Sequence, residues 1–274
     1  MTDATKFQFT NPAVPKAYDE YFVPRLFEPW AKLVLDEARL QPGQALIDVA
    51  TGPGTVARLA APLLGPKGRI LATDIAKPML DIARAKPAQR DAAAIEYVES
   101  GAAPLAAPSG AFDVLICQQG LQFFPDRSAA LREMHRVLKN GGRALIAIWA
   151  EIERNQIFAA FHRALGATVP AELAALITAP FSWYRAGELR AAAEDAGFRD
   201  VRVLTRSLPM VFEQGLDQAV RSFSATPVSP GVAALAPAIQ DAFFTRLRDE
   251  LSKLSRDGKL VGEMVSNIIV ARRA

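Results

Sequence analysis

The feature that most constrains the fold of this sequence is a regular alternation, from about residue 40 to 150, of short apolar runs with stretches of helical periodicity. Most of the runs show little polar alternation, which is typical of strands covered on both faces. Strands that alternate with helices form βαβ units, so the alternation predicts a mostly parallel, doubly wound sheet. The predicted strands are Ala45–Ala50, Arg69–Thr73, Ile95–Val98, Asp113–Cys117 and Arg143–Trp149.

Helical patterns fill the spaces between these runs and continue after them. Ser128–Lys139 and Arg185–Ala196 predict helices, and the stretch up to about Leu40 predicts helices that pack on the core. Val201–Leu208 and Met264–Arg272 predict a sixth and a seventh strand. Between these two strands, an apolar stripe predicts a helix that covers the domain, at Leu235, Ile239, Phe243, Leu247, Leu251 and Leu254.

Composition and charge narrow the class of protein. Half of the 274 residues are apolar, which provides a packed core and excludes a disordered chain. The net charge is +3, and Lys and Arg are interspersed with Asp and Glu, which argues against a nucleic-acid partner. The single cysteine, Cys117, lies in an apolar run, and no Cys/His cluster predicts a metal site. Because there is no signal-peptide pattern and no apolar run of ~20 residues, we predict a soluble cytoplasmic protein without a membrane partner.

A glycine-containing turn after the first predicted strand is the strongest local indication of function. The chain runs from the apolar strand through Gly52 and Gly54 into a predicted helix. The glycines allow a sharp turn and the close approach of a ligand, and the helix start offers free N–H groups. Asp48 lies inside the strand, where an unpaired carboxylate is costly. It therefore requires a partner, either a ligand ammonium or the amides of the loop.

An acidic residue at the end of the second predicted strand indicates a ribose site. A carboxylate at the position of Asp74 can accept hydrogen bonds from both ribose hydroxyls. Ile75 and Met79 follow it and offer an apolar surface for an adenine ring. The segment 52–57 also fits the dinucleotide pattern G-x-G-x-x-G/A, which makes a nicotinamide-dependent oxidoreductase an alternative. Asp48 argues against that alternative, since a dinucleotide turn places no carboxylate there.

Four segments carry a longer pattern, in this order along the chain: Asp48–Gly54, Asp74–Leu80, Phe112–Asp126 and Ala130–Arg143. They resemble the first motif, the second motif, the fourth-strand region and the helix before the fifth strand of class I S-adenosylmethionine-dependent methyltransferases. The first motif of that family is usually D-x-G-x-G-x-G. The chain is most similar to small-molecule methyltransferases of the ubiquinone/menaquinone C-methyltransferase type, over about residues 15–150.

The resemblance implies an α/β fold: a Rossmann-like, doubly wound sheet of about seven mostly parallel strands with a helical cap. Residues 1–274 would form a single methyltransferase domain. Its core would comprise about 40–150, 185–210 and 261–274, and its cap about 1–39, 151–184 and 211–260.

The resemblance also implies S-adenosyl-L-methionine as cofactor, with S-adenosyl-L-homocysteine as product. The matching positions that would bind it are Asp48, Ala50, Thr51, Gly52, Gly54, Asp74, Ile75, Met79, Gly101, Ala102 and Gln118. Two positions depart from the family pattern. Ala50 replaces the usual first glycine, and the stretch at Ser100-Gly101 lacks the acidic residue that accepts from the adenine amino group. That contact is either lost, moved to Ser100, or made by a backbone carbonyl.

The acceptor is less well defined. The candidates for a substrate pocket are Tyr18, Tyr21, Trp149 and His162, of which His162 is the one considered as a catalytic base. Core packing is the alternative role for each aromatic residue. The aromatic content of the cap favours a small, largely apolar acceptor, methylated on O, C or N. A non-catalytic S-adenosylmethionine-binding protein and an NAD(P)-dependent oxidoreductase are the alternatives.

Overall fold

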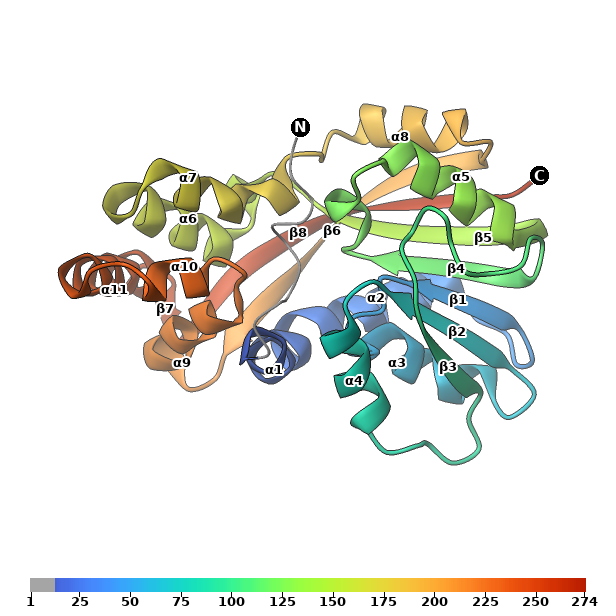
Figure 1. The fold of residues 1–274 in the computed structure, drawn as a ribbon, viewed down its shortest axis with the longest axis horizontal. Helices are drawn as coiled ribbons and strands as arrows, with labels where there is room; N and C mark the ends of the chain where they lie inside the picture. Colours follow the sequence, from blue (N-terminus) through green and yellow to red (C-terminus); the bar gives the residue numbers. More distant parts are fainter. Residues whose placement is uncertain (1–12) are drawn as a thin grey trace.

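The computed structural model describes residues 13–274, which fold around one eight-stranded sheet (Figure 1). Its strands are β1 (Ala45–Val49), β2 (Arg69–Asp74), β3 (Ala94–Glu99), β4 (Phe112–Gln118), β5 (Leu138–Trp149), β6 (Arg199–Phe212), β7 (Ser255–Arg256) and β8 (Lys259–Arg272). The order is β3-β2-β1-β4-β5-β8-β6, with β7 paired to β8. Strands β1 to β5 are parallel, and β8 is antiparallel to β5 and β6. The predicted mostly parallel sheet of about seven strands is confirmed.

Helices cover both faces of this sheet, as a doubly wound fold requires. On one face α2 (Glu28–Ala38) and α3 (Thr55–Leu64) bury their apolar sides against alternate residues of β1, β2 and β4. On the other face α5 (Arg127–Val137) and α8 (Ala186–Asp195) pack on the intervening residues. Two separate cores result, so the central strands are apolar on both sides. This explains why their sequences show no polar alternation.

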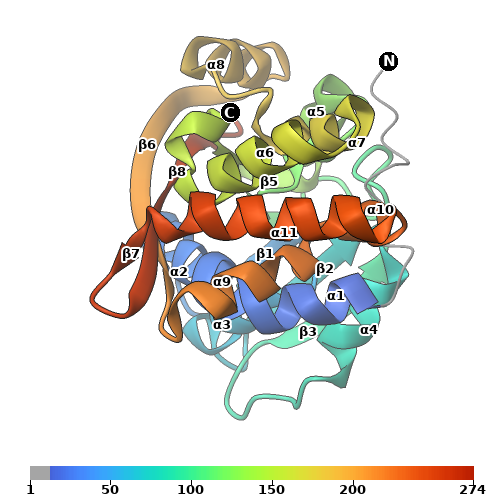
Figure 2. The same cartoon turned by 90° about the vertical axis from the view of Figure 1, so that its left-hand side faces the viewer.

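A helical cap stands beside the carboxyl end of the sheet (Figures 1 and 2). Its elements are α1 (Ala13–Ala17), the π-helix η2 (Tyr18–Phe27), α6 (Gln156–Thr168), α7 (Ala171–Ala175), η5 (Leu176–Phe181), α9 (Gly215–Arg221), η6 (Ser222–Ala225), α10 (Ser229–Ala233) and α11 (Pro237–Ser252). Three further short helices complete the described fold: α4 (Lys77–Ala85), η3 (Leu121–Phe123) and η4 (Ile152–Arg154).

Two long strands connect the cap to the sheet. β8 pairs with β5 only from Ser266 onwards, whereas it pairs with β6 along nearly its whole length. The remaining part of β6 and β8 forms a ribbon that runs into the cap (Figure 1). The helix predicted from the apolar stripe is α11, but its ends differ from the prediction. Leu235 and Leu254 lie just outside the helix and pack, partly buried, on the same core.

Within the described residues, no helix has the length and apolar character needed to cross a bilayer.

Candidate functional site

A cavity of about 560 Å³ lies between the carboxyl ends of the parallel strands and the cap. Ligands of open α/β sheets bind at this end of the strands. One wall comes from the loops after β1, β2, β3 and β4, with Ala50, Gly52, Asp74, Ile75, Ser100, Gly101, Ala102, Gln118 and Gln119 among its residues. The opposite wall is mostly apolar and includes Tyr18, Phe22, Phe27, Trp149, Phe158, Leu176, Ile177, Phe181 and Pro227.

The turn after β1 has a left-handed backbone at three positions: Ala50 (φ +58°), Gly52 (φ +55°) and Gly54 (φ +80°). A Cβ added to Gly52 would meet no atom within 4 Å, so this glycine borders open space in the cavity. A Cβ on Gly54 would instead lie 2.8 Å from the Tyr97 hydroxyl and 3.2 Å from Ala83 Cβ. The two glycines therefore have different roles: Gly52 leaves space for a ligand, and Gly54 allows the turn to pack on its neighbours.

Asp48 is buried behind this turn, with 1% of its surface exposed, and does not line the cavity. One carboxylate oxygen, Oδ2, accepts from the Thr51 hydroxyl (2.5 Å) and the Ala57 amide (3.1 Å). The other oxygen, Oδ1, has no hydrogen-bond partner among the described residues. Burial raises the pKa of Asp48 to about 7 despite the two hydrogen bonds. The loop thus supplies the partner that the sequence required, and Asp48 and Thr51 shape the turn from behind.

Asp74, at the end of β2, lines the cavity and connects the first two turns. Its Oδ2 accepts from the Gly52 amide (2.8 Å), and its Oδ1 accepts from the Ala76 amide (2.8 Å). Burial raises the pKa of Asp74. Each carboxylate oxygen can accept a second hydrogen bond, so the side chain can still bind hydroxyl groups of a ligand. Next to it, Ile75 exposes 62% of its surface, and Met79 lies buried beneath, which provides an apolar shelf at the cavity edge.

The loop after β3 contains no acidic residue where the family usually has one. The Ser100 hydroxyl donates to the Gly101 carbonyl (2.8 Å) and accepts from the Ala106 amide (3.0 Å). This side chain is therefore already used within the loop, which disfavours Ser100 as the replacement for the missing contact. A Cβ on Gly101 would meet nothing within 4 Å, so the loop backbone is open to the cavity at this position.

Gln118 ends β4 and carries the clearest unsatisfied group of the cavity. Its amide nitrogen donates to the Phe27 carbonyl (3.0 Å), which connects the strand end to η2. Its Oε1 is buried and has no partner among the described residues. A buried acceptor without a donor costs about 1–3 kcal/mol, and a ligand with an N–H group would remove that cost.

The π-helix η2 brings three aromatic side chains to the apolar wall: Tyr18, Phe22 and Phe27. Its i→i+5 hydrogen bonding places more residues in each turn than an α-helix has. In an α-helix Tyr18 and Phe27 would lie about two and a half turns apart, on opposite sides. Here both face the cavity, and their rings stack with centroids 4.6 Å apart. The unusual helix is thus what makes this wall aromatic.

The four substrate-pocket candidates separate into two pairs. Tyr18 and Trp149 line the cavity, whereas Tyr21 and His162 do not. Tyr21 is partly buried against the main core, beside the face of η2 that bears the other aromatics. His162 lies on α6 about one helical turn, or 5.4 Å, beyond Phe158, which is the residue of this helix that lines the cavity. Neither Tyr21 nor His162 is among the residues that line the cavity, and their contact with an acceptor stays a prediction.

Several residues that line the cavity were not predicted from the sequence, among them Phe27, Phe123, Phe124 and Thr226. A signal for Phe123 and Phe124 was present, because they lie in the connection between β4 and α5, at the carboxyl end of a strand that faces the ligand side of the sheet. No local pattern could indicate Thr226. It reaches the cavity only because the cap folds back over residues that are distant in the sequence.

A family model of the ubiE/COQ5 methyltransferase family matches residues 13–203. The chain belongs to this family. The match confirms the resemblance inferred from the sequence, together with the methyltransferase class and S-adenosyl-L-methionine as the cofactor of the family. A ubiquinone/menaquinone biosynthesis C-methyltransferase from Xanthomonas campestris is 35% identical over 124 residues, which cover 45% of this chain and 49% of that protein. The chain spans about half the length of the curated relatives it matches.

Solved structures show the same fold at low sequence identity. A phosphoethanolamine N-methyltransferase 2 of Haemonchus contortus superposes with a TM-score of 0.62 at 17% identity, covering 99% of this chain and 59% of that one. An S-adenosylmethionine-dependent methyltransferase from Aquifex aeolicus gives a TM-score of 0.54 at 24% identity, covering 71% and 92%. These similarities show that the chain shares the fold of solved methyltransferase structures.

Proposed function

We propose that this member of the ubiE/COQ5 family transfers the methyl group of S-adenosyl-L-methionine to a small, largely apolar acceptor. The observation that carries the proposal is that one cavity has two unlike walls. The strand-end wall offers Gly52, Asp74 and Gln118, and the cap wall offers aromatic and aliphatic side chains. A cofactor with a polar ribose and amino-acid part suits the first wall, and an apolar acceptor suits the second.

The residues of the strand-end wall fit the cofactor group by group. Asp74 would accept from the ribose hydroxyls, and the exposed Ile75 would pack on the adenine ring. The unsatisfied Gln118 Oε1 would accept from the ammonium of the methionine part. The open backbone at Gly101 supports a carbonyl as the partner of the adenine amino group. Bound cofactor would supply an electrophilic methyl group, and the protein would orient the acceptor and exclude water.

The chain would act by positioning the acceptor. Burial, with Asp74 nearby, raises the pKa of Tyr18 well above its usual value, so this phenol stays protonated. Asp126 also lines the cavity, but its carboxylate accepts from the Ala129 amide as the cap of α5. No histidine lines the cavity within residues 13–274. The acceptor would therefore enter the cavity already as an anion or a free amine, so that no base in the cavity is needed. The name of the Xanthomonas relative supports an apolar ring compound as acceptor.

Two measurements test the proposal. S-adenosylhomocysteine should raise the melting temperature of the protein through mass action, and NAD or NADP should not. Transfer of labelled methyl groups should then be found on members of a panel of apolar phenols, ring carbons and amines. Stabilisation by a nicotinamide cofactor alone would favour an oxidoreductase. Stabilisation by S-adenosylhomocysteine without transfer to any acceptor would favour a binding protein.

A pair of variants tests the apolar wall. Phe181 lines the cavity and lies 5.3 Å from Phe158 between ring centroids, whereas Phe223 is equally buried but packs on Phe161 and Phe243 away from the cavity. Phe181→Leu should raise KM for the acceptor without changing S-adenosylhomocysteine affinity. Both substitutions should lower the stability of the protein by similar amounts, but Phe223→Leu should leave KM unchanged. Equal KM values for both variants would remove the cap wall from the acceptor site.

A further inference from the structure

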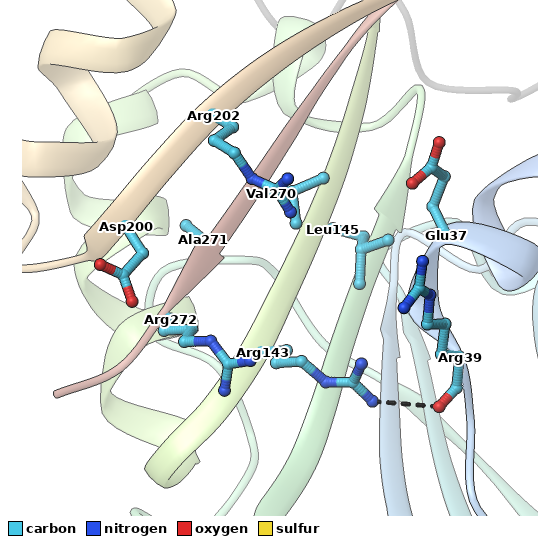
Figure 3. Close-up of a pocket in the computed structure, with 9 residues that line it drawn as sticks. All are labelled: Glu37, Arg39, Arg143, Leu145, Asp200, Arg202, Val270, Ala271 and Arg272. Carbon is cyan, nitrogen blue, oxygen red and sulfur yellow. Dashed lines mark hydrogen bonds between the residues drawn. The ribbon is translucent and has the colours of Figure 1, made fainter.

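A second hollow, of about 420 Å³, lies on the sheet far from the carboxyl ends that form the cavity (Figure 3). Four arginines from four separate parts of the chain line it: Arg39, Arg143, Arg202 and Arg272. Arg39 ends α2, and the other three lie on β5, β6 and β8. The fold thus gathers positive charge that is dispersed along the sequence. We refer to this hollow as the arginine groove.

The strand register places the arginines on one face of the sheet. Arg143 and Arg272 are direct partners in the antiparallel ladder between β5 and β8. Two positions along, Val270 pairs with Leu145 on one side and with Arg202 on the other. Directly paired residues and residues two apart share a face, so Arg143, Arg202 and Arg272 project together. Figure 3 shows Arg202 beside Val270, with the paired Arg143 and Arg272 further along the strands.

The arginines of the groove lack carboxylate partners. Among residues 13–274, no Asp or Glu oxygen lies within 4.0 Å of a nitrogen of these four side chains, although the groove contains Glu37 and Asp200. Glu37 pairs instead with Arg206 at 2.8 Å. Within residues 13–274, the one hydrogen bond that these side chains donate runs from Arg143 to the Arg39 carbonyl, at 3.3 Å (Figure 3). Arg39, Arg202 and Arg272 are exposed residues, and Arg143 is partly buried.

This arrangement is unfavourable for the folded protein alone. Like charges directly opposite each other in a ladder destabilise a sheet, and Arg143 and Arg272 occupy such a pair. Partial burial and the neighbouring Arg272 and Arg39 lower the pKa of Arg143, which reflects the same repulsion. An anion bound between the guanidinium groups would convert the repulsion into attraction. The planar fork of arginine matches the oxygens of phosphate in particular.

We propose that the arginine groove is a binding site for a small molecule that carries two or three linked phosphate groups. The groove has positive charge from several directions, which suits more than one phosphate. Its positive region is also short, because Glu37 and Asp200 stand at opposite sides of the arginines in Figure 3. A nucleic-acid strand would need the positive charge to continue beyond these residues. The groove shares no lining residue with the cavity, so we expect its ligand to bind independently of the cofactor.

The test uses inorganic pyrophosphate with the full chain at constant ionic strength, read by thermal shift and calorimetry. Pyrophosphate should raise the melting temperature of the wild type with saturation, and equimolar sulfate should not. Arg272→Gln and Arg143→Gln should each weaken pyrophosphate binding by about tenfold or more, because each removes a charge-assisted contact. Arg132→Gln, an exposed arginine on α5 outside the groove, is the matched control and should bind as the wild type does.

Two further measurements distinguish a ligand-binding role of the groove arginines from a structural role. Without pyrophosphate, Arg272→Gln should raise the melting temperature, because it removes the repulsion with Arg143; a structural contribution of Arg272 would lower it. All variants should retain normal S-adenosylhomocysteine affinity. The proposal is overturned if the wild type shows no saturable shift, if Arg132→Gln weakens binding as much as the groove variants, or if citrate binds as tightly as pyrophosphate.

Discussion

The two walls of the cavity are built in different ways. The strand-end wall comes from successive strand-to-helix connections between Ala50 and Gly120, each of which follows a parallel strand of the same sheet. The cap wall combines η2 near the start of the described chain with α6, η5 and residues 225–227. The first wall is therefore built from successive segments and carries polar groups such as Asp74 and Gln118, whereas the second is assembled from distant segments and is mostly apolar. Substitutions in the first should affect cofactor binding, and substitutions in the second should affect the acceptor.

The largest effect is expected at Gly52, where one substitution tests directly whether the strand-end wall binds the cofactor. Gly52→Val should abolish S-adenosylhomocysteine binding, because the side chain would enter the cavity from a backbone position with no atom within 4 Å of its Cβ. The left-handed φ of +55° adds backbone strain of about 1–3 kcal/mol. Calorimetry should show no binding heat, while circular dichroism should show a folded protein.

Gly65 provides the matched control for this strain. It has a φ of +64°, also borders open space, and lies at the end of α3 outside the cavity. Because Gly65 combines this φ with a ψ of −179°, a region almost confined to glycine, Gly65→Val should lose at least as much stability as Gly52→Val and still keep its affinity for S-adenosylhomocysteine. Normal binding by Gly52→Val, or loss of binding in both variants, would contradict the inference that the ligand lies close to the backbone at Gly52.

The second-largest effect is expected in the pH dependence of the free energy of unfolding. It arises from Asp48, which is buried behind the strand-end wall. Because burial raises the pKa of Asp48 from 3.8 to about 7, the native state binds this proton more tightly than the unfolded chain does. Stability should therefore fall as pH rises from about 4 to about 7 and then stay constant. Asp48→Asn should flatten this profile by up to about 4 kcal/mol between pH 4 and pH 8.

Urea unfolding of both proteins across this pH range measures the effect as a difference between two curves. Asparagine can still accept from the Thr51 hydroxyl through its side-chain oxygen, which preserves much of the turn. Parallel curves for the wild type and Asp48→Asn would show that Asp48 is ionised in the native protein throughout the range.

A smaller effect is expected at Asp74, on the ligand side of the same wall. Asp74→Ala should weaken S-adenosylhomocysteine binding by at least ~2 kcal/mol, because it removes charge-assisted hydrogen bonds to two hydroxyl groups. It also leaves the Gly52 and Ala76 amides without their present acceptor. Asp81→Ala, which removes an exposed carboxylate on α4, controls for the change in net charge. An affinity by calorimetry equal to that of the control would exclude Asp74 from the ribose site.

The difference between the walls also explains what could be predicted from the sequence. Strands buried on both faces give apolar runs, and the positions just after them are fixed by parallel topology, so Gly52, Asp74 and Gln118 could be placed at one edge before the structure was known. The π-helix could not be predicted, because no sequence period indicates it. The helical spacing that would join Tyr18 to Tyr21 or Phe22 gives no reason to join Tyr18 to Phe27.

The clustering of charge in the arginine groove could not be predicted from the sequence either. Along the chain, Arg39, Arg143, Arg202 and Arg272 are separated by long stretches that contain acidic residues, so the sequence indicates dispersed charge. Strand register brings three of them to one face, and the end of α2 adds the fourth. Clustering of this kind depends on pairing between β5, β6 and β8, which are distant in the sequence. It becomes visible only in the folded chain.

The smallest effect is expected at Ala50, where the chain departs from the family glycine. Ala50 has a φ of +58°, a conformation that costs an L-residue with a Cβ roughly 1–2 kcal/mol. Glycine avoids this cost but loses more backbone freedom on folding, by about 0.5–1 kcal/mol relative to alanine. Ala50→Gly should therefore stabilise the protein by no more than about 1.5 kcal/mol, measured as a shift of the urea midpoint at constant m-value.

A double-mutant cycle with Gly120 sharpens this last prediction. A Cβ on Gly120 would lie 2.6 Å from Ala50 Cβ and 3.0 Å from the Cys117 sulfur, so Gly120→Ala should destabilise the wild type. In the Ala50→Gly background the closer of these two contacts is absent, and the cost of Gly120→Ala should be smaller, although the contact with Cys117 remains. Additive effects would show that the methyl group of Ala50 does not press on the loop after β4. A loss of stability in Ala50→Gly alone would mean that this methyl group contributes packing that exceeds its backbone strain.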